Sequence, residues 1–171
     1  MRLRWGDSAK APIAELLRRY PLQTIAGTFA VVACFAIFYI TTAFSLGYGV
    51  TRLGYSRQAF LGVQLGAIGF MAAGIVLAGW WSDRTTPRNV LMWGCVATIG
   101  GGLLLGPMME AGSLLSIWAF LSLALVMMGL VYGPLGAFLP GLFPARVRYT
   151  GASLAFNIGG IIGGGLTPMV A

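Results

Sequence analysis

The chain has 171 residues, of which 58% are hydrophobic and 9% are charged, and its formal net charge is +7. Soluble domains carry about 25% charged residues, so this composition cannot cover a water-soluble fold with a charged surface. The hydrophobic runs are continuous and not alternating, which favours membrane helices over a transmembrane β-barrel. We therefore expect an all-α membrane protein with the lipid bilayer as its solvent.

From the N-terminus, a short basic segment precedes five apolar segments that contain no charged residue. Each apolar segment is close to the ~20 residues with which a helix crosses ~30 Å of hydrocarbon. We expect a cytoplasmic basic segment over residues 1–21 and a transmembrane bundle over residues 22–171. The expected spans are residues 22–46, 58–80, 90–109, 114–139 and 151–171.

The basic segment allows two interpretations. Residues 12–20 can form an amphipathic helix that lays Ile13, Leu16 and Leu17 on the inner leaflet, or they can belong to a disordered leader. Both alternatives stay open at this stage.

The positive charges are distributed by loop. The first, third and fifth polar segments hold nine of the eleven Lys and Arg residues. The positive-inside rule places these segments, and with them the N-terminus, in the cytoplasm. Because the basic residues follow the order of the spans in this way, we expect a membrane protein and no nucleic-acid partner.

The spans contain no group for acid–base or metal chemistry. There is no histidine in the chain, and the four acids, Asp7, Glu15, Asp83 and Glu110, all lie in polar segments. Cys34 and Cys95 lie inside spans, where they are expected to be small buried apolar residues. We therefore expect no catalytic residue, no metal, no cofactor and no enzyme.

Glycines recur at a spacing of four residues inside the spans. Small residues at this spacing let helix backbones approach closely in lipid, so they predict helix packing. The candidate packing pairs are Gly62 with Gly66, Gly129 with Gly133, and Gly159 with Gly163.

Two loops carry recognisable motifs. The loop after the second span begins at Gly79 and continues with the pair Asp83-Arg84 and with Arg88. The loop after the fourth span reads Phe143-Pro144-Ala145-Arg146-Val147-Arg148-Tyr149-Thr150-Gly151. The first resembles the loop signature of the major facilitator superfamily, and the second resembles the Phe-Pro-x-Arg-x-Arg-Tyr-x-Gly sequence of its metabolite–proton symporter branch. That branch includes shikimate, α-ketoglutarate and proline/betaine carriers.

The resemblance implies a twelve-span transporter built from two six-helix halves. This chain looks like spans seven to ten and part of span eleven, so the resemblance implies that the N-terminal six-helix half and the twelfth span are missing. It also implies a bacterial inner-membrane location and three partners: a small-molecule metabolite, a proton, and the missing half. Thr86 and Pro87 depart from the family pattern, which commonly has a glycine and a basic residue there.

The loop residues are candidates for a cytoplasmic gate. Asp83 can accept backbone N–H groups at a helix N-terminus, and arginines can bridge to groups across a domain interface. Such contacts would form and break in an alternating-access cycle. The alternative is that the arginines only anchor to anionic lipid headgroups. The gating candidates are Gly79, Asp83, Arg84, Arg88, Arg146, Arg148 and Gly151.

A substrate site needs polar side chains that face a cavity at membrane depth. The candidates are Tyr39, Thr42, Gln64 and Asn157, with Tyr39 and Gln64 at similar depth. The alternative for each is an interhelical hydrogen bond, typically worth ~0.6 kcal/mol.

Together these features predict part of a secondary transporter for a small organic acid or similar polar metabolite. Its proton-coupling site would lie in the missing half, because no acid lies within these spans. The alternative is a truncated or degenerate membrane protein without transport activity, acting at most as a helical partner subunit.

Overall fold

The structure, a computed structural model, describes residues 12–170, so residues 1–11 of the expected basic segment and Ala171 lie outside the described residues. Helices occupy each of the five expected segments, and the described residues form no strand. The elements are α1 (Pro12–Arg19), α2 (Pro21–Tyr39), the π-helical turn η1 (Ile40–Phe44), α3 (Ser45–Thr51), α4 (Arg57–Arg84), α5 (Pro87–Gly102), α6 (Leu105–Glu110), α7 (Leu114–Gly141) and α8 (Arg148–Val170).

Three helical stretches in the described part of the chain are long and apolar enough to cross a membrane: residues 21–51, residues 57–84 and residues 114–141. The all-α membrane fold expected from the composition is therefore confirmed.

The helices start where the sequence supplies capping groups. Ser56 and Ser113 precede α4 and α7, and their hydroxyls accept the backbone N–H groups of Ala59 and Ser116. Thr86 caps α5 in the same way, and Pro87 occupies the first helical turn, where its missing N–H costs nothing. The two residues that depart from the family loop pattern thus form an ordinary helix start.

The expected third span is not one continuous helix. α5 ends at Gly102, and the next bonds join Leu103 N to Gly100 O and Leu104 N to Gly101 O, which is the tighter 3₁₀ pattern. Consecutive glycines weaken the helix, and Pro107 cannot donate to the Leu103 carbonyl, so the chain restarts as the separate short helix α6.

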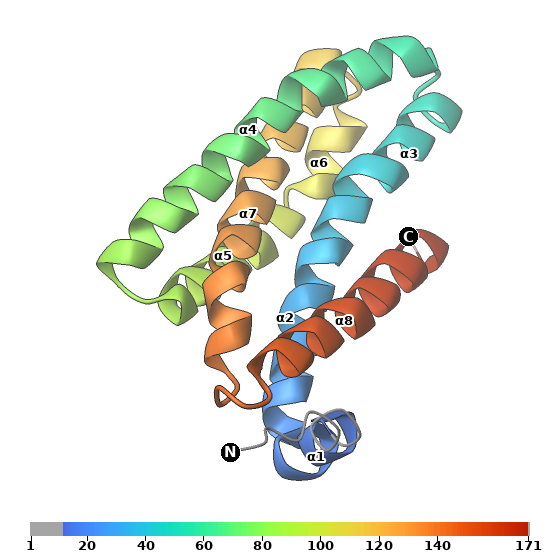
Figure 1. Ribbon diagram of the computed structural model, residues 1–171. Coiled ribbons are helices and arrows are strands. Elements are labelled where there is room, and N and C mark those ends of the chain that lie inside the picture. The colour runs from blue at the N-terminus through green and yellow to red at the C-terminus, as the bar shows by residue number, and fades with distance from the viewer. Residues whose placement is uncertain (1–11, 171) are drawn as a thin grey trace, which may run out of the picture.

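Two pairs of helices run parallel and form the most extensive contacts in the molecule. In the first pair, Gly27 of α2 lies opposite Ala155 of α8, and Phe35 lies opposite Gly163 further along both helices. In the second pair, α4 and α7 run side by side in the same way. Figure 1 shows both pairs, with α5 packed against α7.

Glycines at the two interfaces let the backbones approach closely. A Cβ built on Gly129 would lie 2.6 Å from the Met71 carbonyl oxygen, and one on Gly133 would lie 3.1 Å from the Ile75 carbonyl oxygen. On α8, a Cβ on Gly159 would lie 2.8 Å from the Thr28 oxygen. A side chain at any of these positions would push helices apart.

The remaining glycine candidates differ from one another. Gly163 approaches the Val32 carbonyl oxygen of α2, with 2.9 Å to a built Cβ, whereas a Cβ on Gly66 would meet only the Trp118 indole ring, with its nitrogen at 3.1 Å. A Cβ on Gly62 would meet no atom within 4 Å among the described residues. Its face of α4 points away from the rest of the described chain, so α7 cannot be its packing partner.

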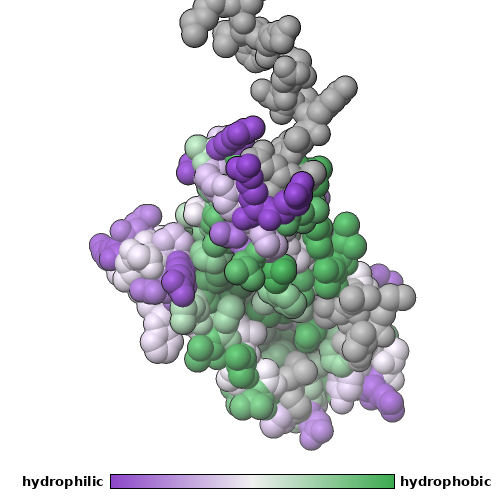
Figure 2. Space-filling model, turned by 90° about the horizontal axis from the view of Figure 1, so that it is seen from below, coloured by the Kyte–Doolittle hydropathy of each residue, from purple (hydrophilic) through white to green (hydrophobic). Residues whose placement is uncertain are grey.

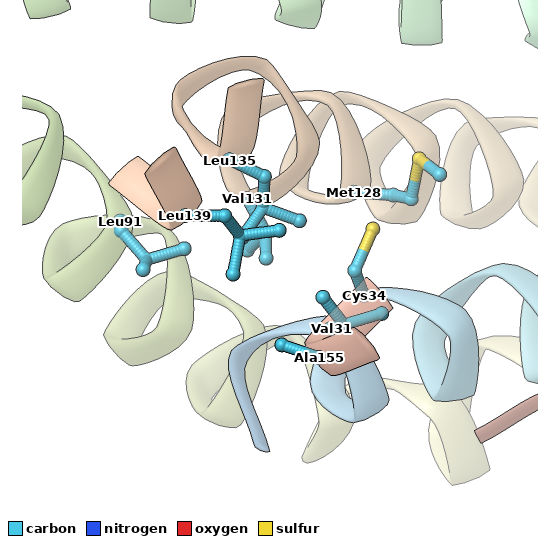
Figure 3. Packing of buried hydrophobic residues seen from close by; sticks show 8 residues of the cluster. All are labelled: Val31, Cys34, Leu91, Met128, Val131, Leu135, Leu139 and Ala155. Carbon is cyan, nitrogen blue, oxygen red and sulfur yellow. The ribbon is translucent and has the colours of Figure 1, made fainter. Parts of the chain in front are cut away.

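The largest buried cluster joins the two pairs. Its α7 residues are Met128, Val131, Leu135 and Leu139; Figure 3 shows the last three at the centre and Met128 at the edge beside Cys34. The residues packed around them are Val31 and Cys34 of α2, Leu91 of α5 and Ala155 of α8. α7 is therefore the helix that connects every other long helix to the core.

The chain ends and loops separate into two groups. The starts of α2, α5 and α8 meet the ends of α4 and α7 at one end of the bundle, together with α1 (Figure 1). Both motif loops lie at this end, which we call the basic end; its described arginines are Arg18, Arg19, Arg84, Arg88, Arg146 and Arg148. Seen from this end, hydrophilic residues form separate groups around hydrophobic surface (Figure 2).

The opposite end carries the tight turns. Gly54 and Gly112 have φ angles of 74° and 68°, a region that suits glycine. The Tyr55 hydroxyl donates to the Gly112 carbonyl, which joins the loop before α4 to the loop before α7. The second helix pair is thereby fixed at this end by a loop–loop contact.

The glycine contact between α4 and α7 yields a test. Replacing Gly129 with Ala should lower the free energy of unfolding by about 1–3 kcal/mol, because the added methyl group forces two backbones apart. The matched control is Gly136→Ala on the same helix, where a Cβ meets no described atom within 4 Å. Thermal unfolding in detergent measures both; equal midpoints for the two variants would contradict the close approach.

Candidate functional site

The candidate site centres on the π-helical turn η1 in the first span. A π turn carries i→i+5 hydrogen bonds, so it holds one residue more than an α turn and disturbs the regular pairing of carbonyl groups. Gln64 of α4 lies beside this turn, and its Nε2 donates to the Thr42 carbonyl at 2.8 Å and contacts the Thr41 carbonyl at 3.4 Å. The Gln64 side chain is 9% exposed.

Hydroxyl groups satisfy further carbonyls around the same turn. Thr41 Oγ1 donates to the Ile37 carbonyl at 2.7 Å, and Thr42 Oγ1 donates to the Phe38 carbonyl at 2.6 Å. Ser45 Oγ reaches back five residues to the Ile40 carbonyl at 2.9 Å. The distorted turn therefore has side-chain hydrogen-bond partners within the chain itself.

Thr42 and Gln64 are thus brought together, but through the backbone of Thr42. Both polar side chains use their donors on carbonyl groups of the chain itself. This is the interhelical alternative that the sequence left open for Gln64. Their role as substrate contacts stays a prediction.

Tyr39 lies one residue before η1 and packs against α8. Its ring stacks near Phe35, with 6.5 Å between ring centroids, and a Cβ on Gly164 would lie 2.9 Å from the Tyr39 ring. The glycine-rich part of α8 therefore makes the space in which this aromatic side chain sits.

Asn157 lies far from Tyr39. Gly159 faces Val31 in the parallel α2–α8 pair, so Asn157 is about ten residues, or ~15 Å, nearer the basic end than Tyr39. Its amide donates to the Ser153 carbonyl at 2.8 Å and to the Ser153 hydroxyl at 3.3 Å. The side chain is exposed and lines a groove of about 430 Å³ between α1 and α8.

A second, mainly apolar cavity of about 120 Å³ lies against η1. Ile40 and Thr41 form one wall, and Gly101 and Gly102, at the end of α5, form another. Phe120 of α7 closes it from a third side. The helix break after α5 and the π turn in the first span therefore border the same space.

The first motif loop has its charged residues exposed. The Arg84 guanidinium lies over the Trp80 ring, 3.7 Å from the ring centroid, which is a cation–π contact within one helix turn. Asp83 and Arg88 are exposed, and Gly79 meets no described atom within 4 Å of a built Cβ. Within the described chain, Thr86 and not Asp83 caps the following helix.

The second motif loop is a compact structural unit. The Phe143 ring lies on Gly151, where an added Cβ would come within 2.6 Å of the ring. Arg148 Nε donates to the Phe143 carbonyl at 3.4 Å and closes the loop. A glycine is therefore required at position 151 to leave space for the Phe143 ring. The motif alone does not specify this role.

α1 docks on this unit and not on lipid alone. Leu16 is 0% exposed and packs with Phe143 and Val147, whereas Ile13 and Leu17 are about half exposed. The expectation that Leu16 lies on the inner leaflet is wrong, because Phe143 and Val147 offer it a protein surface. The sequence gives only a weak sign of this surface, which is the four-residue spacing of Phe143 and Val147 next to Arg146 and Arg148.

The chain belongs to the major facilitator superfamily. The sequence model of the Major Facilitator Superfamily matches residues 4–168. The inner membrane metabolite transport protein YhjE of Escherichia coli is 34% identical over 95% of this chain. The shikimate transporter of Escherichia coli is 30% identical over 95% of it. A Haemophilus influenzae protein named for metabolite transport is 33% identical over 97% of it.

The match covers 38% of the YhjE protein, 37% of the shikimate transporter and 40% of the Haemophilus protein, so the chain spans about two-fifths of these relatives. No solved structure is significantly similar to it. The resemblance inferred from the two loops is confirmed, as is the expected class, a family of transporters and not of enzymes.

The docking of α1 predicts a difference between neighbouring leucines. Leu16→Ala should raise the rate of trypsin cleavage at Arg18 and Arg19 by about tenfold or more, because truncating a buried leucine costs about 2–5 kcal/mol. Leu17→Ala removes an exposed side chain, which is 51% accessible, and should leave the rate unchanged. Equal cleavage rates for the two variants would show that α1 is not held by the loop.

Proposed function

We propose that these helices form part of the C-terminal half of a secondary transporter that moves a small polar metabolite by alternating access. The observation that carries this is the whole-chain match to the major facilitator superfamily together with relatives named as metabolite and shikimate transporters. Because the chain spans about two-fifths of those relatives, the proposal includes an N-terminal six-helix half as partner.

We place this bundle in the bacterial inner membrane with its basic end in the cytoplasm. Six described arginines lie at that end, and Arg52 and Arg57 lie at the other, as the positive-inside rule requires of this orientation. The N-terminus is then cytoplasmic. In this proposed arrangement, residues 1–21 are the cytoplasmic basic segment and residues 22–171 are the transmembrane bundle.

The substrate-facing side of the bundle is proposed to be the α2–α8 face. Tyr39 and Asn157 offer neutral hydrogen-bonding groups on this face, at two depths separated by ~15 Å. Asn157 also borders the groove between α1 and α8, which Ile13 and Tyr149 line as well. Such an arrangement suits a pathway with polar contacts at successive levels, and it favours a polar metabolite over a purely apolar one.

The loops at the basic end are proposed to gate the pathway. Asp83 and Arg88 are exposed and can contact a second half, and Arg84 can leave its Trp80 ring to do so. Arg146 and Arg148 extend from the compact Phe143–Gly151 unit, which holds them in place. Proton coupling is assigned to the partner half, because Glu15, Asp83 and Glu110, the acids within residues 12–170, lie outside the expected spans.

Transport by a chimera tests the proposal. We expect proteoliposomes containing residues 1–171 exchanged for the matching part of the YhjE relative, which supplies the N-terminal half and the remaining C-terminal residues, to take up one of a panel of labelled organic acids and zwitterions under a pH gradient. Vesicles with residues 1–171 alone should take up none. Uptake by residues 1–171 alone, or no uptake of any compound by a correctly inserted chimera, would contradict the proposal.

A substitution on the α2–α8 face tests the residues. Asn157→Ala should raise the KM of uptake by about tenfold, because one or two hydrogen bonds to a desolvated substrate are lost. Asn89→Ala, an exposed amide at the start of α5, serves as the control and should leave KM unchanged. Equal KM values for the two variants would remove Asn157 from the pathway.

A further inference from the structure

The first span changes its helix partner at η1. Before the turn, α2 packs along α8, where Val31 faces Gly159 and Phe35 faces Gly163. After the turn, α3 packs against α4, where the Phe60 ring lies on Gly49 and leaves no room for a side chain there. One continuous helical span therefore belongs to the α2–α8 pair in its first part and to the α4–α7 pair in its last part.

The π turn sets how these two parts are rotated relative to each other. One residue of an α-helix corresponds to ~100° of rotation about the helix axis, so the extra residue in η1 turns everything after it relative to everything before it. With the turn in place, Thr41, Ser45 and Gly49 are all buried. With Tyr39 packed on α8, the rotation at η1 therefore determines which face of α3 contacts α4.

Gln64 is the side chain that holds this turn from outside. Its Nε2 lies 2.8 Å from the Thr42 carbonyl and 3.4 Å from the Thr41 carbonyl, so one amide group addresses the two adjacent carbonyls of the wide turn. The other hydrogen bonds around η1 come from hydroxyls of the same span and move with it. Gln64 lies on another helix, so its hydrogen bonds relate the register of the turn to the rest of the bundle.

The surroundings leave room for the turn to relax. The apolar cavity of about 120 Å³ touches Ile40 and Thr41, and Gly101 and Gly102 form its far wall. On this side of the turn a side chain therefore has space to move when the turn tightens to α-helix, although Thr41 and Ser45 are buried. The hydrogen bonds from Gln64 are a specific contact that can hold the π register against this movement.

We propose that Gln64 is a positioning residue: it fixes the π register of η1, and thereby the rotation between the Tyr39 end and the α3 end of the first span, instead of contacting substrate. This goes beyond the proposed transport function, because the register exists whether or not the chain moves a metabolite. Its consequence for transport rests on the proposed function and is measured separately.

Spin-label distances test the register directly. In a chain with Cys34 and Cys95 replaced by Ala, labels at Gly47 on α3 and Gly136 on α7 occupy positions where a Cβ meets no described atom within 4 Å. A rotation of ~100° moves a side-chain tip by about 8 Å, because a helix with its side chains has a radius of about 5–6 Å. The two labels are separated mainly along the bundle, so only part of this movement appears in their distance, and we expect Gln64→Leu to add a second population at a distance changed by about 3–4 Å.

Three comparisons complete the experiment. Labels at Gly69 and Gly136, which lie within the α4–α7 pair, should keep their distance in Gln64→Leu. Deleting Ala43 removes the extra residue of the turn and should produce the same displaced population while Gln64 is present. Gln58→Leu removes an exposed amide from the same helix and should change neither distance.

The proposal is overturned if the Gly47–Gly136 distance stays the same in Gln64→Leu, whether or not the Ala43 deletion changes it. It is also overturned if the two label pairs move equally, because Gln64 would then support the bundle as a whole. In the chimera, a positioning role lowers the maximal rate of uptake by about tenfold or more and leaves KM within about twofold. A KM that rises more than the maximal rate falls would make Gln64 a substrate contact instead and would overturn the assignment.

Discussion

The close approach of helix backbones at glycines is the constraint on which this fold depends. In lipid, apolar side chains gain little from leaving one apolar neighbour for another, so helices associate through close packing and a few hydrogen bonds. Gly129 and Gly133 bring α7 onto α4, and Gly159 and Gly163 bring α8 onto α2. Once the two parallel pairs exist, the apolar residues of α7 fill the space between them.

Because the helices pack as two pairs, the first span contacts α8 before η1 and α4 after it. The π turn lies between these two parts of the span. The rest of the candidate site follows from that division. Tyr39 sits on the glycines of α8, Gln64 reaches the turn from α4, and a cavity borders the turn on the side of α5. At the basic end, the Phe143–Gly151 unit joins α7 to α8 and receives Leu16.

The sequence was informative where one residue type has one physical consequence. Uncharged apolar segments predicted the helices, and glycines four residues apart on α7 and α8 predicted close packing. Gly62 shows the limit, because spacing does not say which face of α4 meets a neighbour. The break after Gly102 was not predicted, because residues 90–109 were expected to form one span, although the consecutive glycines and Pro107 account for it. The π turn was not predicted either, because Thr41 and Thr42 are compatible with a regular helix and the reason for the distortion lies on α4. Leu16 was misplaced because its partners lie more than a hundred residues away.

Disulfide cross-linking along α2 and α8 tests the parallel packing most directly. A Cβ on Gly27 would lie 3.2 Å from the Ala155 Cβ, and one on Gly163 would lie 2.9 Å from the Phe35 Cβ. Both are below the ~3.5–4.5 Å of a disulfide, so a small outward shift of the helices brings cysteines at these positions into range. In a chain without Cys34 and Cys95, we predict that both pairs cross-link in native membranes. The exchanged pairs, residue 27 with residue 163 and residue 35 with residue 155, should not. Cross-linking of the exchanged pairs in place of the first two would show antiparallel helices and would contradict the account.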